Sequence, residues 1–121
     1  MKIFKCRHCG NMIVYIENKG VPVVCCGEKM QELTVNTEDA STEKHVPVLS
    51  VSGNKVSVVV GSEDHPMTAD HYIGWIAIET KEGRQRKELK NGVPKAEFML
   101  CDGDEVEAVY AYCNLHGFWR N

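Results

Sequence analysis

The sequence lacks a long apolar run. No stretch of its 121 residues approaches the roughly 20 consecutive apolar residues that a membrane-spanning helix needs. The first residues also contain no apolar segment of the kind that precedes a signal-peptide cleavage site. Internal repeats and low-complexity tracts are missing as well. We therefore expect a cytoplasmic protein with no membrane partner.

The sequence also lacks an excess of positive charge. Fourteen Lys and Arg face seventeen Asp and Glu, which gives a net charge of −3 and a pI near 5.9. Because non-specific nucleic-acid binders usually carry a basic face that displaces counterions, we expect no nucleic-acid partner. Residues 1–36 hold five basic and three acidic residues, whereas residues 37–121 hold nine and fourteen. A small anion handled by the second part must be attracted by a local positive group.

No stretch is long and periodic enough to predict a helix. Instead, short segments rich in Val, Ile, Tyr and Thr alternate with turn signals after residue 45, which predicts an all-β antiparallel sandwich or barrel. The stretch "VEAVYAY" (residues 106–112) has little polarity contrast, so we expect burial on both faces. The polar stretch "NTEDASTE", Asn36 to Glu43, predicts a linker. It divides the chain into residues 1–36 and 37–121.

Six cysteines are present, and four of them lie within the first 26 positions. In a reducing compartment, clustered cysteines are more often metal ligands than disulfides. Residues 1–36 are too few to fold on a core of their own, and a bound metal would supply the missing free energy. The predicted ligands are Cys6, Cys9, Cys25 and Cys26. Their spacing leaves zinc and a single iron as alternatives.

The residues around these cysteines carry further predictions. Gly10 and Gly27 follow the two cysteine pairs and should allow tight turns. The second pair is adjacent in sequence and needs a distorted backbone, because neighbours on an extended strand point to opposite faces. His8 is expected to be a solvent-facing turn residue and not a ligand. Cys101 ends the apolar run "FMLC" and is expected to be a buried thiol.

A second metal site is predicted in the second part of the chain. Its candidate ligands stand next to turn or strand-end signals: His45, His65, His71, Cys113 and His116. Four imidazoles and one thiolate suit iron better than zinc, which prefers four ligands in total. Five protein ligands around an ion with an octahedral preference leave one position open for a small molecule.

Together these motifs resemble the desulfoferrodoxin family, the two-iron superoxide reductases. The stretches "CRHCGN", "VCCGEKM", "EKHVP", "HPMTADHYIGW" and "YCNLHGFW" fall in family order over essentially the whole chain. The resemblance implies a desulforedoxin-like module with an Fe(Cys)4 centre, followed by an immunoglobulin-like β-sandwich. In the sandwich it implies an Fe(His)4Cys site, with the histidines in the equatorial plane and Cys113 as axial ligand.

The resemblance also implies roles outside the ligand sets. Glu43 can occupy the sixth position of oxidised iron, and Lys44 faces the substrate, superoxide. The implied reaction is the one-electron reduction of superoxide to hydrogen peroxide, with a rubredoxin-like electron donor and a homodimeric protein. Tyr72 stands where the family often has tryptophan, which should alter packing more than ligation.

Two other interpretations stay open from the sequence. An electron-transfer or metal-storage protein would have a coordinatively closed second iron and would not turn over. A zinc-bound structural or adaptor module would be colourless, whereas both iron centres should absorb visible light through sulfur charge transfer. Metal content and colour would distinguish these interpretations.

Overall fold

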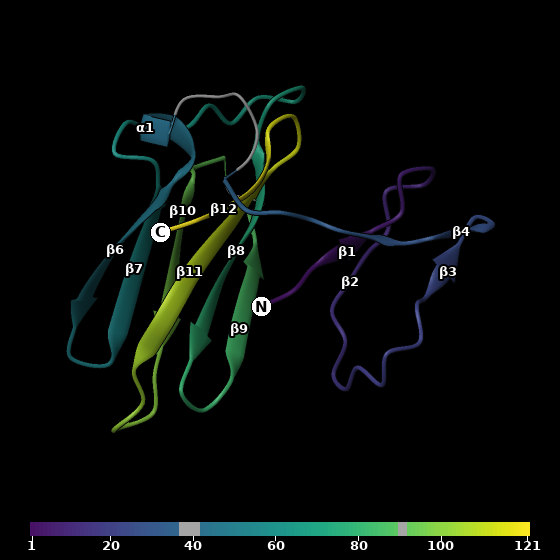
Figure 1. Ribbon diagram of the computed structural model, residues 1–121. Coiled ribbons are helices and arrows are strands. Elements are labelled where there is room, and N and C mark those ends of the chain that lie inside the picture. The colour runs from purple at the N-terminus through teal and green to yellow at the C-terminus, as the bar shows by residue number, and fades with distance from the viewer. Residues whose placement is uncertain (37–41, 90–91) are drawn as a thin grey trace. The chain divides into compact units, whose positions relative to one another are not determined.

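The computed structural model describes residues 1–36, 42–89 and 92–121, which contain twelve β-strands and one short helix (Figure 1). By their internal contacts they form two compact units, Met1–Thr34 and Val35–Asn121. Within the described ranges, no helix has the length and apolar character needed to cross a membrane.

The first unit is built from very short strands. They are β1 (Phe4–Lys5), β2 (Met12–Ile13), β3 (Val24–Cys25), β4 (Glu28–Lys29) and β5 (Gln31–Glu32). β1 is the centre of a sheet ordered β2-β1-β5, and β3 pairs with β4 in a separate hairpin. Among residues 1–34, all of which are described, only Ile3, Cys6 and Met30 are buried apolar residues. Such a core is too small to stabilise the unit alone, so the unit depends on what its cysteines bind.

The second unit confirms the predicted immunoglobulin-like sandwich. One antiparallel sheet has the order β10-β7-β6 and the other β12-β11-β8-β9 (Figure 1). The strands are β6 (Pro47–Ser52), β7 (Lys55–Val60), β8 (Ile73–Thr80), β9 (Arg84–Glu88), β10 (Lys95–Met99), β11 (Val106–Cys113) and β12 (Gly117–Arg120). The helix α1 (Thr42–His45) precedes β6 and lies at one end of the sandwich (Figure 1).

Strand β11 is buried continuously from residue 108 to residue 113, as predicted from its weak polarity contrast. Its inward side chains join the core between the two sheets, where Val109 and Cys113 are fully buried. On the other face, Tyr112 stacks on Trp75 with ring centroids 5.8 Å apart, and Tyr110 stacks on Phe118 at 5.2 Å. This aromatic layer covers the outer face of the strand, which is why both faces are buried.

The prediction that Cys101 is buried is wrong. The residue is exposed. Side chains alternate along the extended chain at the end of β10, so that Phe98 and Leu100 point into the core while Met99 and Cys101 point to solvent.

The predicted linker, Asn36 to Glu43, is ordered at both of its ends. Asn36 accepts a hydrogen bond from the backbone N–H of Arg120 at 2.9 Å and donates its own N–H to the carbonyl of Phe118 at 2.9 Å. At the other end, Thr42 and Glu43 belong to α1. The rest of the predicted linker, residues 37–41, lies outside the described residues.

Candidate metal centres

The first unit brings four cysteine sulfurs together. Cys6, Cys9, Cys25 and Cys26 each offer one sulfur, and all four lie within 4.8 Å of one another. Cys9 Sγ is 3.6 Å from Cys25 Sγ. Four sulfurs at these separations can surround a single ion tetrahedrally.

The turns that carry these sulfurs have the backbone that the sequence predicts. Gly10 and Gly27 have φ values of +82° and +76°, and Cys26 itself has a φ of +51°. On a regular strand, Cys25 and Cys26 would point to opposite faces. The left-handed conformation of Cys26 brings its sulfur back to the side of its neighbour. Such a conformation is strained for a residue with a Cβ, and it persists only where its surroundings require it.

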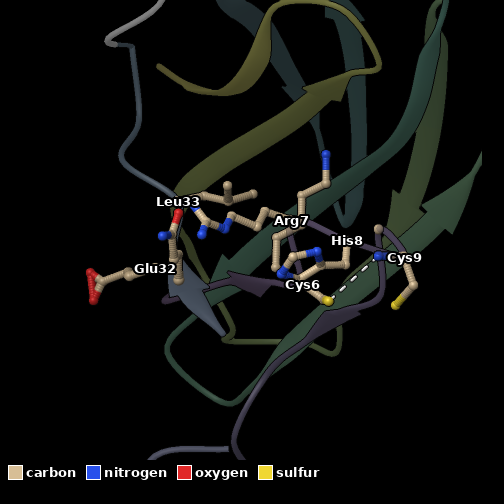
Figure 2. A pocket seen from close by; sticks show the side chains of 9 residues that line it. Cys6, Arg7, His8, Cys9, Glu32 and Leu33 are labelled. Carbon is tan, nitrogen blue, oxygen red and sulfur yellow. Dashed lines mark hydrogen bonds between the residues drawn. The ribbon is translucent and has the colours of Figure 1, made fainter. Parts of the chain in front are cut away.

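The ionisation of these thiols indicates that the cluster fits a cation. The backbone N–H of Cys9 donates to Cys6 Sγ at 3.5 Å (Figure 2), and this bond contributes most to lowering the pKa of Cys6 to about 6. The Cys9 side chain contributes most to raising the pKa of Cys26 to about 12. One thiolate therefore forms readily, whereas further negative charge accumulates only if a cation compensates it.

The carboxylate of Glu28 links the two turns that carry the cysteines. Glu28, in the hairpin of Cys25 and Cys26, lies 2.8 Å from Arg7 Nε and 2.5 Å from His8 Nε2. His8 and then Arg7 lower the pKa of Glu28. His8 is exposed, as predicted, and this contact gives it a structural role. The Arg7–His8 turn also lines a pocket of about 490 Å³ (Figure 2).

The second ligand set lies at one end of the sandwich. His45 ends α1, His65 and His71 lie in the loop between β7 and β8, Cys113 ends β11, and His116 lies in the turn before β12. The loop and strand ends that carry them come from both sheets. Folding of the sandwich therefore brings together residues that are up to 71 positions apart.

The four imidazole rings form a closed cycle. Successive ring centroids are 4.7 Å (His45–His65), 4.6 Å (His65–His71), 5.1 Å (His71–His116) and 4.8 Å (His116–His45) apart. The His45–His71 diagonal is longer, at 6.4 Å. His45 Nε2 lies 3.2 Å from His65 Nε2 and 3.1 Å from His116 Nδ1, so ring nitrogens face a common point. The buried Cys113 Sγ lies 3.9 Å from His116 Nδ1.

One of the four histidines, His65, has the protonation that a metal site requires. His65 Nδ1 is 2.7 Å from the carbonyl oxygen of Pro66. Because a carbonyl only accepts, Nδ1 carries the proton and the Nε2 lone pair faces the cluster. Burial lowers the pKa of His65 to about 4, so its ring is neutral at pH 7.

A buried ring nitrogen without a hydrogen-bond partner gives the most direct test of whether these residues fit a metal ion. His71 Nε2 is buried and has no hydrogen-bond partner among the described residues. Buried polar atoms without partners are rare in native proteins. A cation at the centre of the cycle would satisfy this atom, so the residues present fit a metal ion.

Trp119 holds two of the predicted ligands and was not predicted to contribute. Its ring stacks on that of His45 with centroids 4.9 Å apart, and its Nε1–H donates to the carbonyl of His116 at 2.9 Å. Trp119 is almost completely buried. The only signal in the sequence is its position three residues after His116.

Asn114 joins the two loops that carry the remaining ligands. Its side-chain oxygen accepts from the backbone N–H of Tyr72 at 2.8 Å, and its side-chain nitrogen donates to the carbonyl of Asp70 at 2.9 Å. Both contacts lie next to His71, while Asn114 itself follows Cys113. This amide side chain, together with the backbone hydrogen bond from Asn114 to the Tyr72 carbonyl at 3.1 Å, holds Cys113 and His71 in their relative position.

Glu43 and Lys44 lie on the exposed surface of α1, immediately before His45. The pKa of His71 is lowered first by burial, then by the charge of His116, and then by the charge of Lys44. Lys44 directly precedes the buried His45 on the same short helix, so its charge is one residue away from a member of the histidine cycle. The roles predicted for Glu43 and Lys44 stay predictions.

Known proteins resemble this chain over its full length. The sequence model of the desulfoferrodoxin family matches residues 37–121. A desulfoferrodoxin homolog of Archaeoglobus fulgidus is 46% identical over 122 residues, covering 100% of this chain and 96% of the relative.

Solved structures agree with the sequence comparison. The superoxide reductase of Treponema pallidum is 39% identical, with a TM-score of 0.83 and coverage of 98% of both chains. A one-iron superoxide reductase of Giardia intestinalis is 42% identical, with a TM-score of 0.53. It covers 65% of this chain and 95% of its own, so most of the shared structure lies in the larger unit.

Proposed function

The chain belongs to the desulfoferrodoxin family, and from that premise we propose that it is a superoxide reductase that converts superoxide to hydrogen peroxide. The observation that carries the proposal is the closed cycle of four histidines with the buried Cys113 beside it and the unsatisfied His71 Nε2. Five donors of this kind leave one position for a small ligand on an octahedral metal. Relatives and neighbours of the chain are named superoxide reductase.

The chain has two mononuclear iron sites. The proposed ligands of the first are the four cysteines of the small unit, as Fe(Cys)4. For the second, the four histidines of the cycle would hold the iron through ring nitrogens, and the buried Cys113 beside them would add a thiolate. Iron with a thiolate ligand supplies the one electron that, with two protons, converts superoxide to hydrogen peroxide.

The protein side chains prepare this second site in three ways. The hydrogen bond from His65 to the Pro66 carbonyl fixes which ring nitrogen faces the metal. Complete burial of Cys113 keeps water from its sulfur. Lys44, on the exposed turn, attracts the anion in a chain whose net charge is −3. Glu43, which precedes Lys44 on the same exposed turn, would offer a carboxylate to the iron.

Each turnover consumes an electron that must be replaced. We propose a rubredoxin-like protein as donor, a cytoplasmic location, and a homodimeric assembly. The proposed domains are residues 1–36, as the desulforedoxin-like module, and residues 37–121, as the catalytic domain. The first iron either relays electrons to the second or only stabilises its own module.

A stoichiometric measurement tests the proposed function. Reduced protein with known iron content receives a measured dose of superoxide without oxygen, and both peroxide and dioxygen are quantified. One peroxide per superoxide and no dioxygen is the expected result. Dioxygen released together with peroxide would mean dismutation. A rate no higher than the uncatalysed control would leave an electron carrier or a structural metal protein.

Removing the charge of Lys44 should slow the reaction with superoxide. We expect Lys44→Ala to lower the second-order rate constant by about two- to tenfold at low salt and to weaken its dependence on ionic strength, because local positive charge raises the encounter rate of an anion. Pulse radiolysis or stopped flow would measure both quantities.

The matched control is Lys81→Ala. Lys81 follows the end of β8 that is remote from His71, and it pairs with Glu105 at 2.8 Å on the exposed surface. Lys81→Ala removes the same charge as Lys44→Ala but leaves the histidine cycle and its surroundings unchanged. If both variants slow the reaction equally, net charge and not the position of Lys44 controls the rate.

A further inference from the structure

Gly61 occupies a position where a side chain does not fit, directly against the turn that carries Glu43 and Lys44. It follows β7, is buried, and has a φ of +83°. A Cβ added there would first meet the carbonyl oxygen of Glu63 in its own loop, and it would lie 2.5 Å from the carbonyl oxygen of Glu43 and 2.7 Å from the Cα of Lys44. All three are backbone atoms, which cannot rotate away as the end of a side chain can. A residue larger than glycine must therefore displace the Glu43–Lys44 backbone or the loop itself.

Hydrogen bonds join the same two segments. The backbone N–H of Gly61 donates to the carbonyl of Val46 at 3.1 Å, and that of Glu63 donates to the carbonyl of Glu43 at 3.0 Å. The Ser62 hydroxyl donates to the same Glu43 carbonyl at 3.4 Å. A helix of four residues is not stable alone. The loop of residues 61–63 therefore holds the Glu43 side of α1, while His45 at the end of the helix packs on Trp119.

We propose that Gly61 is a positioning residue for superoxide reduction. Because it has no side chain, the loop of residues 61–63 can pack against α1 and hold Lys44 beside the histidine cycle. This inference rests on the proposed function, since it assigns Gly61 an effect through Lys44 and Glu43. Gly61 itself is buried and has no group that could bind substrate.

The test compares two glycines with the same backbone conformation. Gly103 has a φ of +87°, and a Cβ added to it meets nothing within 4 Å. It precedes β11, at the end of that strand remote from Cys113. Gly61→Ala and Gly103→Ala thus introduce the same strain, but only the first introduces a clash. Both variants are prepared with iron, and iron content and the Cys113 sulfur charge-transfer band are measured first.

In Gly61→Ala we expect a near-normal iron content and a near-normal sulfur charge-transfer band. The rate constant for the reaction with superoxide should be about three- to tenfold lower, and it should depend less on ionic strength. Gly103→Ala should behave as the unmodified protein. The double variant Gly61→Ala, Lys44→Ala should react no more slowly than Lys44→Ala alone, because both changes act on the same charge. Additive losses, or a normal rate in Gly61→Ala, would overturn the proposal.

Hydrogen exchange gives a readout that does not depend on turnover. Mass spectrometry of the iron-loaded proteins should show faster exchange in peptides containing residues 42–46 and 61–63 for Gly61→Ala, and unchanged exchange for Gly103→Ala. If Gly61→Ala does not fold, Ser62→Ala removes one bond to Glu43 without adding atoms, and it should accelerate exchange at residues 42–46. Unchanged exchange in the folded variant would overturn the proposal. Absence of superoxide reduction in the unmodified protein would instead refute the proposed function. The exchange result would still show whether Gly61 holds α1 in place.

Discussion

Cys113→Ser is expected to abolish the sulfur charge-transfer band of the second iron and to lower the rate of superoxide reduction at least about a hundredfold. The expected loss is this large because replacing residues outside the ligand set already lowers metal affinity or activity by about 10–100-fold. Cys113 is fully buried in the sandwich core, with its sulfur 3.9 Å from His116 Nδ1. Serine is nearly isosteric but offers a hydroxyl that is not ionised at neutral pH. The fold should therefore persist while the thiolate is lost. Visible absorption, iron content and stopped-flow rates measure the three effects.

The matched control is Cys9→Ser in the first unit. It removes one of the four sulfurs that lie within 4.8 Å of one another and should bleach the first centre only. Superoxide reduction should continue in Cys9→Ser if the second site alone performs the reaction. Loss of both absorption bands in either variant would contradict two independent sites. Loss of activity in Cys9→Ser with the second iron still bound would favour an electron relay.

The two units differ in how far their folding depends on a bound metal. In the first unit, three buried apolar residues cannot stabilise the chain, so the ligands and their metal provide the core. In the second unit, a packed sandwich exists apart from the ligands, and strand ends position them. Chelation should therefore unfold the first unit and leave the second largely folded.

The two clusters of candidate ligands were predictable from the sequence, because they depend on residue type and spacing. Cysteines at positions 6 and 9, followed by an adjacent pair, leave few other interpretations, and the strained Cys26 backbone follows from that adjacency. The alternating segments predicted an antiparallel sandwich or barrel, and the resemblance to the desulfoferrodoxin family selected the sandwich. The burial of β11 on both faces could be read from the lack of polar residues along it.

The residues that hold the ligands were not predictable, because their roles arise from packing between distant parts of the chain. Nothing local marks Gly61 as the glycine that meets α1, while Gly103 has an equally positive φ and open space around it. Asn114 would be an ordinary turn residue if the Asp70–Tyr72 loop did not lie opposite. Cys101 was wrongly predicted to be buried for the same reason, since its exposure depends on the register at which β10 ends.

Trp119 should be the most consequential of these supporting side chains. Trp119→Ala should cost about 3–5 kcal/mol of folding free energy, as is typical when a buried aromatic residue is removed. Trp119→Phe keeps most of the volume and the stacking on His45, but it leaves the carbonyl of His116 without its donor, at a cost of about 1–3 kcal/mol. Because that carbonyl belongs to a proposed ligand, His116, we also expect Trp119→Phe to lower iron affinity roughly tenfold.

Trp75→Phe separates the effect on the metal from the effect on packing. Trp75 stacks on Tyr112 at 5.8 Å on the outer face of the sheet, in the same strand layer, and is not in ring contact with a histidine in the described residues. Its replacement should lower the denaturation midpoint without changing iron retention against a competing chelator. Trp119→Phe should lower both. Equal iron retention in the two variants would mean that Trp119 only fills the core. Selective iron loss in Trp119→Phe would show that the hydrogen bond from Trp119 to the His116 carbonyl holds this proposed ligand in place.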